Sequence, residues 1–206
     1  MLKNEYQLLK GVVPTELTDM IYDEGLRLRR DWTRYSDWQG ISCAGRFSEN
    51  LLEFYREFMP TIARQFFDND MYYFNDQIVM KIPHDDLSFA PHYDNYYGTN
   101  RDGKFQTVNL SVILNDFTHE SGGFEVLVND KWIDLTKQLK RGDVLAIEGN
   151  TVHRSHQNKS SEPRGLYACV FTEKPMGMKD FYEDRTRTKL PRRSYTIIRI
   201  DGKAFH

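Results

Sequence analysis

The chain has 206 residues, enough for one domain with a sizeable core, and 39% of them are hydrophobic, as in a globular protein. With 28 Lys and Arg against 30 Asp and Glu, the net charge of −2 demands neither a nucleic-acid nor a membrane partner. Two distant cysteines, no secretory leader and no long apolar run argue against a disulfide framework or a membrane span, and predict a cytoplasmic protein.

Two helical stretches are predicted near the start of the chain. Residues 15–30, TELTDMIYDEGLRLRR, have apolar side chains at helical spacing, among them Leu17, Met20 and Ile21. Residues 48–67 form the second stretch, with Ser48 as its N-cap, and Pro60 should kink or split it.

From residue 72 onward the pattern changes to short β-rich runs separated by turn signals such as HESGG and KRGD. The runs are YYFNDQIVMKI, SFAPHYDNYY, FQTVNLSVILN, GFEVLV, KWIDL, GDVLAIEG, TVHRSHQN and GLYACVFTE. Their number and spacing predict an antiparallel sandwich, barrel or jelly roll. The fold class is therefore mainly β with N-terminal helices (α+β), and the helices should buttress one sheet.

Two His-x-Asp pairs compete for a functional role. On a strand, residues i and i+2 face the same way, so such a pair aims an imidazole and a carboxylate at one point. His84 and Asp86 lie in the polar segment PHDD, which predicts a solvated turn. His92 and Asp94 lie in the aromatic run FAPHYDNYY, which can hold a strand. The second pair is therefore the better candidate for a metal site.

A third ligand must come from a distant strand. His153 enters the run TVHRSHQN just after GDVLAIEGNT, while His156 should face the other side of that strand and His119 lies in a turn. Two histidines and one carboxylate form the facial triad of non-heme Fe(II) oxygenases, although zinc accepts the same set. His92, Asp94 and His153 are thus the predicted metal ligands. They do not by themselves decide whether the metal is iron or zinc.

Arg164 is the candidate anchor for an anionic ligand. The segment TVHRSHQNKSSEPRGLYACVF predicts a hairpin turning at residues 158–161, which would place Arg164 opposite His153. A guanidinium near the metal can hold a carboxylate through two parallel hydrogen bonds.

As an ordered set, these residues resemble the iron(II)- and 2-oxoglutarate-dependent dioxygenases, closest to the prolyl-hydroxylase-like and phytanoyl-type groups, over residues 72–173. The matching motifs are His92-x-Asp94, Gly122-Gly123 before FEVLV, Gly142-Asp143, His153 and Arg164. The resemblance implies a double-stranded β-helix, Fe(II) held by His92, Asp94 and His153, and 2-oxoglutarate paired with Arg164. It also implies O2 as co-substrate, and release of succinate and CO2 as a substrate is oxidised.

Some features depart from that pattern or leave it open. Leu166 stands where many members have serine, and MKIPHDD lacks the tyrosine with which prolyl hydroxylases contact the co-substrate, so the second contact to 2-oxoglutarate is open. Asp94 favours hydroxylation, because related halogenases replace that carboxylate with a small residue. The substrate is open between a protein side chain, a nucleobase and a small metabolite, and so is the oligomeric state.

Two other functional classes fit the same residues. A metal-dependent, cupin-like isomerase or hydrolase would use the triad without needing Arg164. A non-catalytic jelly-roll binding module would bind neither iron nor 2-oxoglutarate, since a fold does not fix a function.

The last segment has a different character, and a domain boundary is expected near residue 175. Residues 1–175 form the oxygenase domain, with a helical buttress at 1–71 and the β core at 72–175. Residues 176–206 resemble the start of tRNA-His guanylyltransferase-like enzymes, with Arg199, Asp201 and Gly202 matching an RxDG motif. This implies a piece of a longer two-domain protein or a relic, keeps a nucleic-acid partner open, and leaves the strand YTIIRI in need of a partner strand.

Overall fold

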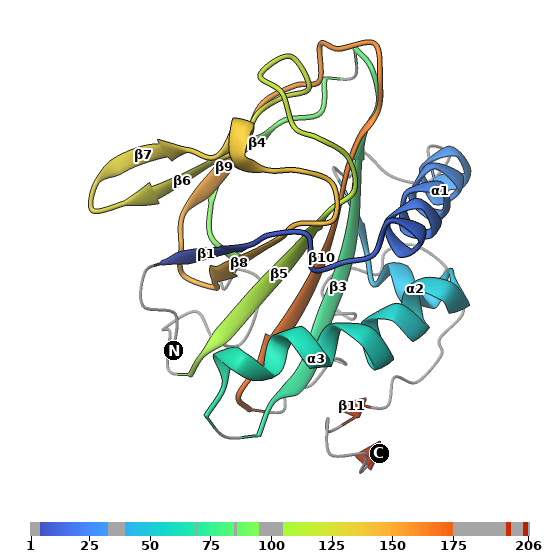
Figure 1. Cartoon of the computed structure of the whole chain (residues 1–206), viewed down its shortest axis with the longest axis vertical. Coiled ribbons are helices and arrows are strands. Elements are labelled where there is room, and N and C mark those ends of the chain that lie inside the picture. The colour runs from blue at the N-terminus through green and yellow to red at the C-terminus, as the bar shows by residue number, and fades with distance from the viewer. Residues whose placement is uncertain are drawn as a thin grey trace.

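The computed structural model describes residues 5–32, 40–68, 70–84, 86–94 and 105–174, and the backbone of residues 197–198 and 204–205. Two antiparallel sheets make up the β core of the described chain, and helices cover one of them (Figure 1). The predicted jelly-roll class is confirmed. Among the described residues, no helix is both long and apolar enough to cross a bilayer.

The major sheet has the strand order β1-β8-β5-β10-β3-β2. Its strands are β1 (Tyr6–Leu9), β2 (Ile41–Ser42), β3 (Tyr72–Lys81), β5 (Thr107–Ile113), β8 (Val144–Glu148) and β10 (Arg164–Thr172). Every residue of β5 and β10 is buried. Both faces of the sheet are therefore covered along its two central strands.

The minor sheet has the order β4-β9-β6-β7. Its strands are β4 (Phe89–His92), β6 (Glu125–Val128), β7 (Lys131–Asp134) and β9 (His153–Ser155). The predicted strand at 88–97 ends earlier than expected, because the chain leaves the sheet after His92 and Asp94 begins a turn.

Three helices buttress the major sheet, as predicted: α1 (Thr15–Trp32), α2 (Glu49–Glu53) and α3 (Met59–Ala63). Ser48 caps α2 by accepting a hydrogen bond from the Leu51 N–H at 3.2 Å. A π-helical turn, Phe54–Phe58, separates α2 from α3, and Pro60 follows at the start of α3. Proline has no N–H to donate and its ring crowds the preceding turn, so the helix widens there instead of breaking.

Alternate residues of β10 belong to two hydrophobic cores. Tyr167, Cys169 and Phe171 pack in the core beneath the helices. Leu166 and Ala168 face the other way and pack in the core between the two sheets. Gly25 allows the close approach of α1, since a Cβ there would lie 2.7 Å from the side chains of β3.

The first strand of the major sheet was not predicted from the sequence. β1 pairs with β8 in antiparallel register, Tyr6 opposite Ile147. The carboxylate of Asp143 holds the end of β1, because it accepts from the Gly11 N–H and from the Lys10 ammonium, both at 2.9 Å. A short edge strand whose partners lie far away in sequence leaves little trace in local periodicity.

The C-terminal segment contains one described pair of short strands, β11 (Ile197–Ile198) and β12 (Ala204–Phe205). From the sequence, YTIIRI was expected to be disordered, to dock on the oxygenase sheet or to pair with another copy of the chain. Its described residues, Ile197–Ile198, pair instead with β12 of the same segment. The other residues of 176–206, including Arg199, Asp201 and Gly202, lie outside the described residues.

A buried carboxylate ties β3 to the helical layer. The Asp76 Oδ2 accepts hydrogen bonds from the Tyr167 hydroxyl and from the Gly45 N–H, both at 2.7 Å. Burial raises the pKa of Asp76 to about 6, although these two hydrogen bonds oppose the shift.

Asp76→Asn should make the free energy of unfolding less dependent on pH. The folded carboxyl holds its proton more tightly than an unfolded one, so it stabilises the fold at low pH and this contribution is lost as pH rises through about 6. Between about pH 5 and about pH 8, the free energy of unfolding of the variant should fall by roughly 1–2 kcal/mol less than that of the parent, as measured by urea titration. The matched control is Asp68→Asn at an exposed position. An unflattened profile in Asp76→Asn would contradict this role.

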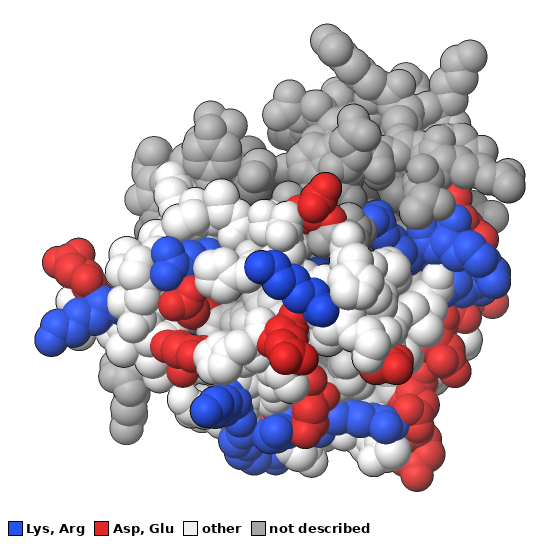
Figure 2. All heavy atoms as spheres, turned by 90° about the horizontal axis from the view of Figure 1, so that it is seen from above, with Lys and Arg blue, Asp and Glu red and all other residues white. Residues whose placement is uncertain are grey.

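Acidic and basic side chains both occur across the face shown in Figure 2, and the group of basic side chains at its right lies next to acidic ones. Exposed ion pairs occur among the described residues, such as Lys140 with Asp116 at 3.0 Å. This described surface has no continuous basic stripe of the kind that follows a nucleic-acid backbone.

Candidate active site

The three predicted metal ligands meet at one end of the minor sheet. β4 and β9 pair in antiparallel register, with His92 directly opposite His153 and their ring centroids 4.3 Å apart. Asp94 lies just beyond β4, and its Oδ1 is 3.8 Å from the His153 Nε2. One ligand atom from each of the three residues falls within 4.8 Å of the others, close enough to surround a single metal ion.

Both imidazoles are oriented by their own backbone. The carbonyl oxygen of Ala90 lies 2.8 Å from the His92 Nδ1, and that of Thr151 lies 3.0 Å from the His153 Nδ1. A carbonyl can only accept, so each Nδ1 carries the proton and each Nε2 keeps a lone pair for a metal. Burial, followed by the nearby His153, lowers the pKa of His92, which favours the neutral imidazole that a metal requires.

Aromatic rings hold the imidazoles from the side. Phe89 stacks on His92 with ring centroids 5.7 Å apart, and Phe124 stacks on His153 at 5.6 Å. Phe124 follows Gly122, whose φ of 103° suits glycine and whose Cβ, if present, would lie 2.3 Å from the His156 carbonyl oxygen. The Gly122-Gly123 motif therefore brings the chain close enough to place Phe124 against a metal ligand.

Asn109 is a site residue that sequence reasoning missed. It lies on β5, and its Nδ2 donates a hydrogen bond to the Asp94 Oδ2 at 2.8 Å. Asn109 alternates with Thr107 and Ser111 along a strand whose other residues are apolar, and all three are buried. A row of polar side chains on one face of a buried strand was the signal in the sequence.

The alternative pair, His84 and Asp86, does not join the cluster. Both side chains are exposed, and His84 has a φ of 59° in a turn after β3. The choice of the second His-x-Asp pair over the first is therefore supported by the arrangement of the described residues.

Arg164 opens β10 and is 1% exposed. Its Nη1 donates to the Gly123 carbonyl oxygen at 2.7 Å and its guanidinium lies 4.2 Å from the centre of the Phe117 ring, but its buried Nε has no hydrogen-bond partner. No carboxylate of the described residues pairs with it. Burial lowers its pKa to about 9, and a buried guanidinium with an unpaired N–H is a donor that an anion could satisfy.

The predicted hairpin between His153 and Arg164 is wrong. β9 belongs to the minor sheet and pairs with β4 and β6, while β10 belongs to the major sheet, where Arg164 lies opposite Lys81. The connection cannot form a tight turn, because the fully buried Asn158 donates to the carbonyl oxygens of Lys81 and Glu162 and holds the chain between the sheets. Arg164 is linked to the metal ligands through Gly123 and Phe124 instead.

Lys81 is a second buried cation that the sequence reading missed. It is 0% exposed, and its ammonium donates to the Ser155 Oγ at 2.8 Å and to the His156 carbonyl oxygen. Cross-strand neighbours project from the same face of a sheet, so Lys81 and Arg164 both extend toward the space between the sheets. Lys81 lies in MKIPHDD, the segment in which no co-substrate contact was identified from the sequence.

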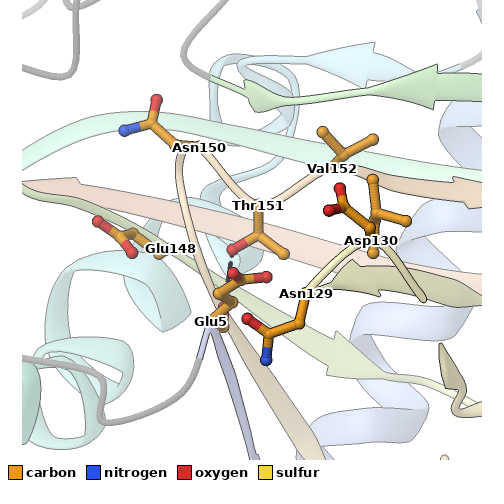
Figure 3. Close-up of a pocket in the computed structure, with 8 residues that line it drawn as sticks. Glu5, Asn129, Asp130, Glu148, Asn150, Thr151 and Val152 are labelled. Carbon is orange, nitrogen blue, oxygen red and sulfur yellow. Dashed lines mark hydrogen bonds between the residues drawn. The ribbon is translucent and has the colours of Figure 1, made fainter. Parts of the chain in front are cut away.

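A cavity of about 310 Å³ lies elsewhere, beside the turn between β6 and β7. Its lining includes the carboxylates of Glu5, Asp130 and Glu148 (Figure 3). Thr151 also lines it and donates to the Glu5 carbonyl oxygen at 2.8 Å. None of the predicted metal or co-substrate residues faces this cavity, so it is distinct from the candidate site.

Three solved structures share this fold. The epimerase SnoN, in complex with Fe3+, alpha ketoglutarate and nogalamycin RO, is 16% identical, with a TM-score of 0.69 over 99% of this chain and 92% of its own. EvdO2 from Micromonospora carbonacea var. aurantiaca, complexed with 2-oxoglutarate, is 17% identical, with a TM-score of 0.66 over 84% and 87%. EctD from S. alaskensis, in its apo form, is 15% identical, with a TM-score of 0.68 over 82% and 73%.

Among curated proteins, none matches the chain significantly. A family model does match: it is described as phytanoyl-CoA dioxygenase (PhyH) and covers residues 44–166. That range contains both predicted histidine ligands, Asp94 and Arg164. Because the match covers more than half of the chain, the protein belongs to the phytanoyl-CoA dioxygenase (PhyH) family of iron- and 2-oxoglutarate-dependent oxygenases.

Proposed function

We propose that this chain is an Fe(II)- and 2-oxoglutarate-dependent hydroxylase of a small metabolite, with His92, Asp94 and His153 as metal ligands and Arg164 as the co-substrate anchor. The observation that carries the proposal is the combination of a compact His-Asp-His cluster with a fully buried guanidinium that lacks an anion. A zinc hydrolase would need the cluster but would have no use for that guanidinium.

The residues of the cluster fit iron. His92, His153 and Asp94 would supply two neutral imidazoles and one carboxylate, a ligand set that suits Fe(II) and would leave positions open for small ligands. Bound there, Fe(II) supplies the activation of O2 that couples decarboxylation of 2-oxoglutarate, to succinate and CO2, with oxidation of the substrate. Retention of the Asp94 carboxylate favours transfer of a hydroxyl group over transfer of a halide.

The co-substrate fits the buried cations. 2-Oxoglutarate carries two negative charges, and its distal carboxylate can accept from the free Nε–H of Arg164, while Lys81 adds positive charge to the same interior. These side chains bind and orient the co-substrate, and the apolar core between the two sheets excludes water around it. The protein contributes position and charge, and the oxidising chemistry belongs to the metal.

The proposed substrate class rests on analogy. SnoN is an epimerase solved with nogalamycin RO, a small molecule, and it shares the fold. Interspersed charge on the described surface gives no separate support for a nucleic-acid substrate. The assay must therefore also be able to detect a nucleobase or a protein side chain as the substrate.

A succinate assay tests the proposal. Purified protein with Fe(II), 2-oxoglutarate and ascorbate should form succinate slowly by itself and faster with a pool of small metabolites, whose consumed member should gain an oxygen atom by mass spectrometry. Stimulation by RNA or by peptides instead would overturn the substrate class. No succinate under any condition, with metal bound, would favour the cupin-like hydrolase, and no metal binding at all would favour the binding module.

A further inference from the structure

The two oxygens of the Asp94 carboxylate have different surroundings. Oδ1 faces the metal cluster, 3.8 Å from the His153 Nε2. Oδ2 accepts a hydrogen bond of 2.8 Å from the Asn109 Nδ2, a side chain that belongs to the other sheet and is 7% exposed. One oxygen is therefore directed at the ligand cluster and the other is occupied by an amide.

The direction of that amide is fixed by a second hydrogen bond. The Ser111 Oγ donates to the Asn109 Oδ1 at 3.1 Å. Since the amide oxygen is taken by a donor, the amide NH2 is the end that faces Asp94. Asn109 and Ser111 both lie on β5, which is paired with β8 on one side and β10 on the other, so their positions are held by backbone hydrogen bonds on both edges.

A carboxylate can bind a metal through one oxygen or through both. Asp94 lies past the end of β4, where no strand pairing restrains its rotation. Binding through both oxygens would need a rotation that brings Oδ2 toward the metal. The 2.8 Å hydrogen bond from the buried Asn109 opposes that rotation, because lengthening it weakens the pairing of a buried donor. A carboxylate bound through both oxygens would also occupy a metal position that the co-substrate or O2 needs.

We propose that Asn109 is a positioning residue that restricts Asp94 to one-oxygen coordination and so keeps a metal position open for 2-oxoglutarate. The inference rests on the proposed metal site. It assigns to Asn109 an effect on how the co-substrate binds, beyond any contribution of its hydrogen bond to folding.

Asn109→Leu tests this, because leucine has the same branching and number of heavy atoms as asparagine but cannot donate a hydrogen bond. The proteins are loaded with Co(II), their visible absorption spectra are recorded, and 2-oxoglutarate binding is measured by calorimetry without turnover. The variant should keep its affinity for Co(II) but show a changed visible absorption spectrum, because a second carboxylate oxygen replaces a water ligand and alters the coordination geometry. Its affinity for 2-oxoglutarate should fall about tenfold.

Ser111→Ala is the milder companion variant, since it keeps Asn109 and removes only the hydrogen bond that orients it. It should change the Co(II) spectrum and the 2-oxoglutarate affinity in the same direction as Asn109→Leu, but by a smaller factor. If Asn109→Leu does not fold, Ser111→Ala alone tests the role of Asn109. Parental spectra and parental 2-oxoglutarate affinity in the folded variants would overturn the inference. A different result would show that the proposed function itself is wrong. In that case the parent binds Co(II), and His153→Ala binds it with the same affinity.

Discussion

His153→Ala should abolish metal binding and succinate formation, and His92→Ala and Asp94→Ala should do the same. Each removes one of three ligand atoms that converge within 4.8 Å, and two remaining ligands do not hold a divalent ion against water at micromolar concentration. Calorimetry with Mn(II) or with anaerobic Fe(II) measures binding, and the succinate assay measures turnover.

The controls for the ligand variants come from the same chain. His156→Ala changes a histidine that lies just after β9 but faces the surface, 3.0 Å from Glu125. His84→Ala and Asp86→Ala change the other His-x-Asp pair, whose side chains are exposed. All three should bind metal as the parent does. Loss of binding in the His84 or Asp86 variant, with binding intact in His92→Ala, would show that the wrong pair has been assigned.

Arg164→Ala should raise the apparent KM for 2-oxoglutarate many-fold while metal still binds. Loss of a desolvated, charge-assisted pair costs about 2–5 kcal/mol, because the partner carboxylate stays buried without a counter-charge. The guanidinium is buried and its Nε is unpaired in the free protein. Its removal should therefore lower the free energy of unfolding by less than it weakens co-substrate binding. Initial rates at varied 2-oxoglutarate, together with calorimetry for the metal, separate the two effects.

Two further arginine variants sharpen this comparison. Arg164→Lys keeps the charge but loses the planar fork, and should fall between the parent and Arg164→Ala. Arg154→Ala removes an arginine of β9 that pairs with Glu125 at 2.7 Å on the surface, and should leave the KM unchanged. An unaltered 2-oxoglutarate affinity in Arg164→Ala would remove the main reason to prefer this function over a zinc-dependent cupin.

The candidate ligands could be predicted from the sequence because their signals are local. His92 and Asp94 share a short motif, and His153 opens a strand of its own, so spacing and composition were enough to select three residues that the fold brings together. The neighbours of the cluster are non-local: Asn109 and Lys81 reach it from two strands of the other sheet. No periodicity along one segment indicates which distant strand will supply a hydrogen bond.

The wrongly predicted hairpin between His153 and Arg164 also depends on non-local pairing. TVHRSHQN and GLYACVFTE are consecutive β runs with a turn signal between them, and consecutive antiparallel strands usually pair. In a jelly roll the chain passes between sheets at such connections, and here a buried side chain, Asn158, holds the crossing in place. Local pattern therefore identified the strands correctly but not the sheet to which each belongs.

The division of the site between two sheets has a consequence for co-substrate choice. The proposed metal ligands His92 and His153 belong to the minor sheet, whereas Arg164 belongs to the major sheet, and an apolar core lies between the two sheets. In this arrangement the packing of that core sets the distance that a diacid must bridge. If Arg164 anchors the far carboxylate as proposed, we expect a homologue shorter or longer by one methylene to miss either the guanidinium or the metal. Selectivity for chain length is then a collective property of buried apolar side chains, none of which needs to contact the diacid.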